Sequence, residues 1–107
     1  MDNNVMLVDL AKNQKLNEIK LFLLENESFP INFTTDDGSN LLHFVATRLS
    51  ENTLGIIQLL LEKGVDPLAV NEKFITPIEV AKENNNIPAL TIMKHYINKK
   101  MQDSKNY

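Results

Sequence analysis

The sequence predicts an all-α domain organised as a helical solenoid, with three helix–loop–helix repeats joined by short turns or hairpins. Apolar residues recur at the i, i+3, i+4 spacing of amphipathic helices in six stretches that form three pairs. Equivalent apolar positions lie about 33 to 38 residues apart, a period typical of helical repeat proteins. The 107-residue chain is 43% apolar and has no cysteine, so a shared hydrophobic core must stabilise it without disulfides.

The first pair of helices is predicted within residues 5–34. Leu7, Leu10 and Ala11 share one helix face. On a second helix, one face carries Leu16, Ile19, Phe22 and Leu23. The segment from Asn26 to Pro30 ends this pattern, because the residue before a proline is biased away from helix.

The second pair is predicted within residues 35–70 and opens at the turn signal Asp37-Gly38. One short helix is expected from Leu41 to Leu49 and another over Ile56–Leu61. Gly64 stands where a glycine commonly ends a helix.

The third pair is predicted within residues 71–100. Thr76 can cap a helix, and Pro77 suits its first position, where no amide donor is needed. The loop Asn84–Asn86 separates this helix from a last one that starts near Pro88. The polar tail, residues 99–107, is expected to be frayed, and the whole chain, 1–107, to form one domain.

These repeats resemble the ankyrin repeat over about residues 5–98. Gly38–Ala46 matches the family pattern G-x-T-P-L-H-x-A-A, and Ile56–Asp66 matches I-V-x-L-L-L-x-x-G-A-D. The third repeat keeps Thr76-Pro77-Ile78 and the first keeps Leu10-Ala11. The resemblance implies stacked helix pairs whose role is to bind a protein.

The sequence departs from the family pattern at several places. Glu79 stands where the family has His, and Phe74 where it has Gly. The middle repeat has extra residues within Arg48–Thr53, and the first turn has extra residues within Glu27–Thr35. Since the outer repeats are the degenerate ones, as capping repeats are, we expect a three-repeat protein. The alternative is a piece cut from a longer array.

The charge is distributed unevenly along the chain. The net charge is −3, and the first two repeats are acidic whereas residues 71–107 are basic. This is either ordinary surface charge or an acidic front that attracts a basic partner and repels nucleic acid. We read the lysines of the tail as a solvated helix end. Because the sequence shows no signal peptide or membrane span, we expect a cytoplasmic protein that contacts no membrane. We also expect the chain to be a monomer on its own.

No motif in the sequence predicts an enzyme, a cofactor or a metal site. The resemblance assigns His43 to hydrogen bonds within and between repeats. His95 has no acidic or histidine neighbour at helical spacing, and Asp36-Asp37-Gly38 lacks the closing Glu of a calcium loop. Phosphate loops and nucleophile elbows are also missing.

The resemblance implies that partners meet the turn tips and the exposed side of each first helix. Carried over by position, the expected partner-binding residues are Lys12, Asn13, Asp36, Asp37, Ser39, Thr47, Arg48, Glu72, Lys73, Phe74, Ile75, Glu83 and Asn84. Phe74 either anchors a partner or folds back onto the neighbouring repeat.

The expected function is non-catalytic protein binding. Our leading specific hypothesis is a stand-alone inhibitor, such as a bacterial immunity protein that neutralises a toxin; abundant Asn, Lys and Ile with a single Arg indicate an AT-rich genome. The main alternative is an ankyrin-type effector or adaptor that engages a host or cellular protein.

Overall fold

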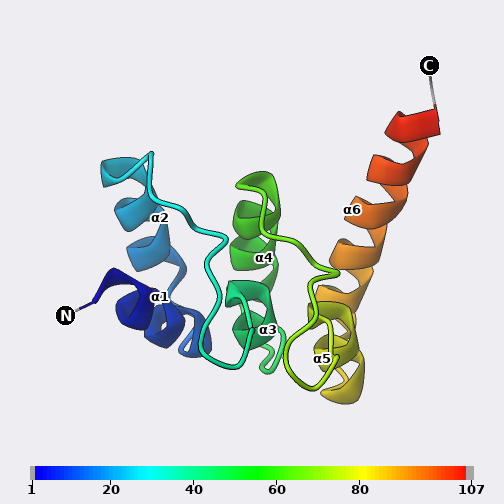
Figure 1. Ribbon diagram of the computed structural model, residues 1–107, viewed down its shortest axis with the longest axis horizontal. Coiled ribbons are helices and arrows are strands. Elements are labelled where there is room, and N and C mark those ends of the chain that lie inside the picture. The colour runs from blue at the N-terminus through cyan, green and yellow to red at the C-terminus, as the bar shows by residue number, and fades with distance from the viewer. Residues whose placement is uncertain (1, 106–107) are drawn as a thin grey trace.

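The computed structural model describes residues 2–105, which form six helices and, within that range, no strand (Figure 1). The helices are α1 Asn3–Lys12, α2 Leu16–Glu25, α3 Leu41–Val45, α4 Thr53–Glu62, α5 Pro77–Glu83 and α6 Ile87–Lys105. The predicted all-α class is therefore confirmed, and so is the predicted order of three helix pairs.

The helices pack in two layers. Within each pair the two helices contact each other, and the pairs lie side by side along the molecule (Figure 1). The first helices α1, α3 and α5 touch in that order, and the second helices α2, α4 and α6 do the same. The central pair α3–α4 therefore contacts both neighbours, and its residues dominate the core.

The core is one apolar cluster drawn from all three pairs. Its fully or almost fully buried members are Leu7, Ala11, Ile19, Leu23, Ile31, Leu41, Leu42, Val45, Ala46, Ile56, Ile57, Leu60, Leu61, Val65, Ala81, Ala89 and Met93. No pair could bury its apolar face alone, so the stacking of the pairs supplies the hydrophobic stabilisation.

Side chains at the helix starts explain where the first helices begin. The Asp2 carboxylate accepts a hydrogen bond from the Asn4 N–H at 2.8 Å. In α5, the Thr76 hydroxyl accepts from the Glu79 N–H at 3.2 Å, while the Glu79 carboxylate accepts from the Thr76 N–H at 3.3 Å. This reciprocal capping box satisfies backbone donors that a helix start leaves free. Pro77 occupies the first position of α5, as predicted.

The helix expected from Leu41 to Leu49 is shorter than predicted. It ends at Val45, and the Leu49 side chain is 57% exposed. Leu49 keeps the apolar spacing, but it lies in the extra segment Arg48–Thr53, where the chain no longer continues α3. The spacing alone could not show where this insertion begins.

Two buried carboxamides hold the insertion between the flanking pairs. Gln14 Nε2 donates to the carbonyls of Val45 and Arg48, at 3.0 and 2.8 Å. Its Oε1 accepts from the hydroxyls of Ser50 and Thr53. From the other side, Asn86 Nδ2 donates to the same Arg48 carbonyl at 3.0 Å. We call Gln14 and Asn86 the amide clamp.

The C-terminal segment also differs from the expectation of a frayed tail. Helix α6 continues through residues 99–105, and residues 106 and 107 lie outside the described part of the chain. Over residues 2–105, no helix combines the length and the hydropathy that crossing a membrane requires.

Candidate functional site

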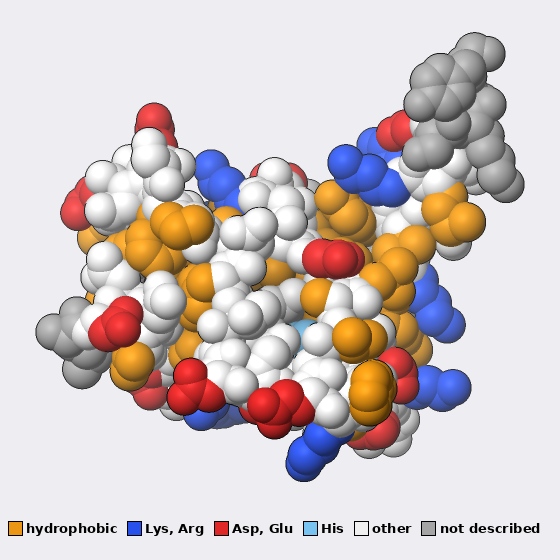
Figure 2. Space-filling view, viewed as in Figure 1, with side chains coloured by type: hydrophobic (Ala, Val, Ile, Leu, Met, Phe, Trp, Pro, Cys, Tyr) orange, Lys and Arg blue, Asp and Glu red, His pale blue; other side chains and the backbone are white. Residues whose placement is uncertain are grey.

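Two turns that precede α3 and α5 form the tips of the second and third repeats. In one, the Thr35 N–H donates to the Ser39 carbonyl at 2.9 Å; in the other, the Asn71 N–H donates to the Ile75 carbonyl at 3.1 Å. The Glu72 N–H also donates to the Asp37 carbonyl at 2.8 Å and joins the tips. Figure 2 shows acidic side chains along this edge of the molecule.

Phe74 occupies the same place in its turn that Gly38 occupies in the preceding one. Gly38 has φ +82° and Phe74 has φ +61°. A Cβ on Gly38 would lie 3.3 Å from the Asn71 Cα, so the neighbouring turn leaves little room for a side chain there. The turn around Phe74 is therefore not reshaped: the phenylalanine adopts the left-handed conformation that favours glycine.

The Phe74 ring faces solvent. The residue is 81% exposed, more than any other large apolar residue described here. The alternative that Phe74 folds back onto the neighbouring repeat is therefore wrong. Gln14 and Asn85 also have positive φ. Gln14 gains buried hydrogen bonds there, and asparagine tolerates this region, whereas Phe74 has neither compensation.

The Asp37 carboxylate holds the first tip in shape. It accepts from the Thr35 hydroxyl, and from the Ser39 N–H and hydroxyl at 3.1 Å each. These hydrogen bonds, led by that from Thr35, lower the pKa of Asp37 below its usual value. In the second tip, the Asn71 side chain accepts from the N–H groups of Lys73 and Ile75. Both tips are therefore fixed by side chain–backbone bonds.

His43 links the two tips. Its Nδ1 accepts from the Asn40 N–H at 2.9 Å, so the proton lies on Nε2, which donates to the Ile75 carbonyl at 2.8 Å. The side chain is 3% exposed. The structural role implied for His43 is therefore confirmed. Glu79 stands at the equivalent position of the third repeat, and its carboxylate accepts from the N–H and the hydroxyl of Thr76 in its own repeat.

Replacing His43 by alanine is expected to lower the free energy of unfolding by about 1–3 kcal/mol, because it leaves the buried Asn40 N–H without a partner and removes one of the two hydrogen bonds that the Ile75 carbonyl accepts. Chemical denaturation measures this loss, with His95→Ala, a change at an exposed position, as control. Partner binding by the folded variant should persist. Unchanged melting with lost binding would instead place His43 in the binding surface.

The structure places the predicted partner-binding residues in two separate rows. Asp36, Asp37 and the residues 72–75 lie at the tips, near the starts of the first helices. The others lie near the C-terminal ends of those helices: Lys12, Asn13, Thr47, Arg48, Glu83 and Asn84. Asn13 and Asn84 each cap their helix through a side-chain bond to its last turn.

Ser39 does not belong to the exposed surface, contrary to expectation. It is 4% exposed, since its hydroxyl donates to Asp37 and accepts from Asn71 Nδ2 at 3.4 Å. The Ser39 side chain therefore links the two tips by hydrogen bonds and is too buried to contact a partner. Ile75 is only partly buried and remains beside Phe74 at the edge.

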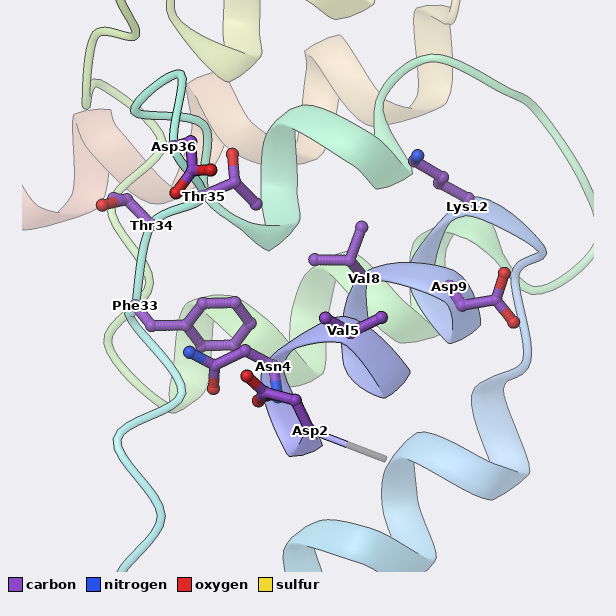
Figure 3. Close-up of a pocket in the computed structure, with 10 residues that line it drawn as sticks. All are labelled: Asp2, Asn4, Val5, Val8, Asp9, Lys12, Phe33, Thr34, Thr35 and Asp36. Carbon is purple, nitrogen blue, oxygen red and sulfur yellow. Dashed lines mark hydrogen bonds between the residues drawn. The ribbon is translucent and has the colours of Figure 1, made fainter.

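A groove of about 390 Å³ lies between α1 and the segment that leads to the first tip (Figure 3). Val5, Val8 and Phe33 supply its apolar surface. Sequence reasoning missed this groove, apart from Lys12 and Asp36 at its rim. The signal was Val5 and Val8, spaced i, i+3 on a different face of α1 from Leu7.

No protein-family model matches this chain, and no curated protein is significantly similar to it. Among residues 2–105, no three His, Asp or Glu side chains lie close enough together to hold a metal ion.

Proposed function

We propose that the chain is an ankyrin-type helical solenoid that binds another protein through its turn tips. The observation that carries the proposal is Phe74, an 81%-exposed aromatic residue held at φ +61°. A backbone strain of this kind is stored at functional sites, and buried aromatic anchors contribute much of the energy of protein interfaces. An exposed phenylalanine that no neighbouring side chain covers fits such an anchor.

The rigidity of the tips supports the same function. Asp37 and Asn71 fix the backbone of the two turns, and His43 joins them. A surface ordered before binding loses less conformational entropy in the complex. The specific form we propose is inhibition: the domain covers a partner surface, as a bacterial immunity protein covers its toxin.

Capture from native lysate tests this function. The immobilised wild-type chain should enrich a protein that the Phe74→Gly variant does not retain, and the purified protein should bind directly with one-to-one stoichiometry. The inhibitor form predicts that binding abolishes the partner's own activity, whereas an adaptor leaves it intact. Equal recovery of every protein on the two surfaces would contradict the proposal.

The charge of the tips leads to a prediction about association kinetics with this partner. We expect the association rate constant to fall by about tenfold between low and high salt, while dissociation changes less, because exposed carboxylates steer a basic partner over long range. Stopped-flow or surface kinetics at several salt concentrations would measure it. Asp36→Asn combined with Glu72→Gln should flatten the dependence. An association rate that is flat for the wild type would remove steering from the mechanism.

A further inference from the structure

We propose that the groove between α1 and the segment Phe33–Asp36, called here the α1 groove, binds a partner segment in which cationic side chains flank small apolar ones. The inference rests on the protein-binding function proposed above and adds the chemistry of the partner. Asp36 belongs both to the rim of the groove and to the first tip. A protein bound on the tips therefore reaches the groove without crossing unrelated surface.

The lining of the groove is a second apolar face on α1. The first face, which includes Leu7 and Ala11, is fully buried in the core. The second carries Val5, which is 58% exposed, and Val8, which is partly buried. Phe33 extends it from the opposite side, and both Val8 and Phe33 also pack against the core at the floor of the groove. Solvent-facing helix positions are normally polar, and valine is a weaker helix former than alanine or lysine. Apolar residues grouped in a groove at such positions indicate a docking surface.

The rim of the groove is acidic. Asp2, Asp9 and Asp36 lie at separate corners, and their side chains do not converge on one point (Figure 3). Lys12 is the one basic residue of the lining, and its Nζ lies over the Phe44 ring, 5.3 Å from the ring centroid. The net charge of this rim suits cationic groups spaced along a polypeptide.

The carboxylates at the rim keep capacity for a ligand. Asp2 accepts one hydrogen bond from the Asn4 N–H, and Asp9 accepts one from Asn13 Nδ2 at 3.3 Å. An ionised carboxylate offers about four acceptor sites, so each can also accept from a lysine or arginine. The groove volume of about 390 Å³ falls within the range of roughly 300–1,000 Å³ found for binding clefts.

Three capped octapeptides test the proposal: alternating Lys and Val as the probe, alternating Gln and Val without the charge, and alternating Lys and Ser without the apolar side chains. Titration of the ¹⁵N-labelled protein, followed by amide chemical shifts, gives both the affinity and the location. We expect the Lys–Val peptide to shift signals of α1 and of residues 33–36, and to bind at least about fivefold tighter than either control peptide.

Matched variants separate a specific groove from general charge attraction. Asp9→Asn combined with Asp36→Asn should lower the affinity for the Lys–Val peptide by roughly threefold to tenfold, since each exposed ion pair contributes modestly. Val5→Lys should abolish binding of the Lys–Val peptide. The control Glu18→Gln with Glu25→Gln removes the same charge from exposed positions on α2 and should change affinity by less than about twofold. An unchanged amide spectrum elsewhere establishes that each variant is folded.

The proposal is overturned if no peptide shifts the groove signals, if the Gln–Val or Lys–Ser peptide binds as tightly as the Lys–Val peptide, or if the control pair weakens binding equally. Capture from lysate distinguishes failure of the groove proposal from failure of the protein-binding function. A captured partner that is lost with Phe74→Gly but retained by the Val5→Lys and Asp9→Asn/Asp36→Asn variants leaves the function standing and refutes the groove. A chain that captures nothing, yet binds the peptide in the groove, refutes the function instead.

Discussion

Replacing Leu60 by alanine is expected to lower the free energy of unfolding by about 2–5 kcal/mol, because it empties a fully buried leucine site. Leu60 is 0% exposed and lies on α4, which packs against both α2 and α6. A cavity there weakens the contacts on which all three pairs depend. Since the total stability of a small domain is about 5–15 kcal/mol, this single change removes a large part of it.

Urea denaturation followed by circular dichroism measures this effect, and one transition is expected because the central pair couples its neighbours. Leu49→Ala is the matched control: the same atoms are removed from a side chain that is 57% exposed, and the loss should stay below about 1 kcal/mol. A loss of under about 1 kcal/mol for Leu60→Ala would mean that Leu60 is not in the core.

Replacing Phe74 by glycine is expected to weaken partner binding by about 2 kcal/mol or more, because the change removes an aromatic anchor from the tip. Folding should be unaffected or slightly improved, since glycine occupies a positive φ without the strain that a Cβ introduces. Partner binding is weakened while folding is unaffected or improved, a combination that few substitutions produce. Titration calorimetry with the captured partner and thermal melting of the free protein measure them separately.

Phe74→Ala is the control for the backbone. Alanine also removes the ring but keeps a Cβ at the strained φ, so binding should fall as in the glycine variant while the stability gain is absent. If Phe74→Gly instead melts much earlier and binds as before once folded, the ring contributes to packing. The binding surface would then lie in the other row, around Thr47 and Arg48.

Local patterns in the sequence predicted the helix pairs because helix formation and capping depend on neighbours within one turn. The apolar spacing around Leu7 and Ile57, the Thr76-Pro77 start and the glycine at Gly64 all fall where they were expected. The end of α3 was misplaced because Leu49 happens to continue the spacing into an insertion. A leucine on a loop and a leucine on a helix look alike in a one-dimensional pattern.

What the sequence could not predict depends on contacts between distant residues. Gln14 reads as a polar residue of an ordinary turn, yet it is only 3% exposed. Its hydrogen-bond partners lie more than thirty residues away in the sequence, so no local pattern could show that it is buried. Ser39 reads as an exposed tip residue, yet it is 4% exposed, and its hydroxyl accepts a hydrogen bond from Asn71 in the neighbouring turn. The α1 groove likewise exists only because the segment before the first tip folds across the helix.

The turn position held by Gly38 in the first tip and by Phe74 in the second shows how local and distant information combine. The sequence placed Phe74 correctly at this position, and the conformational preference of glycine predicted backbone strain there. It could not say whether the ring was covered, because that depends on which elements lie beside the tip. The structure resolves the question in favour of exposure.

The amide clamp makes the three repeats dependent on their order. Repeat arrays are commonly treated as strings of interchangeable modules that can be duplicated, deleted or exchanged. Here Gln14 in the first repeat and Asn86 in the third both bind the Arg48 carbonyl, which exists in that position only because of the insertion in the second. A chimera with a regular middle repeat would take the Arg48 carbonyl from both buried carboxamides, and the Ser50 and Thr53 hydroxyls from Gln14. Such a chain can therefore diversify readily at its exposed tips, whereas a change in its number of repeats requires simultaneous changes in three places.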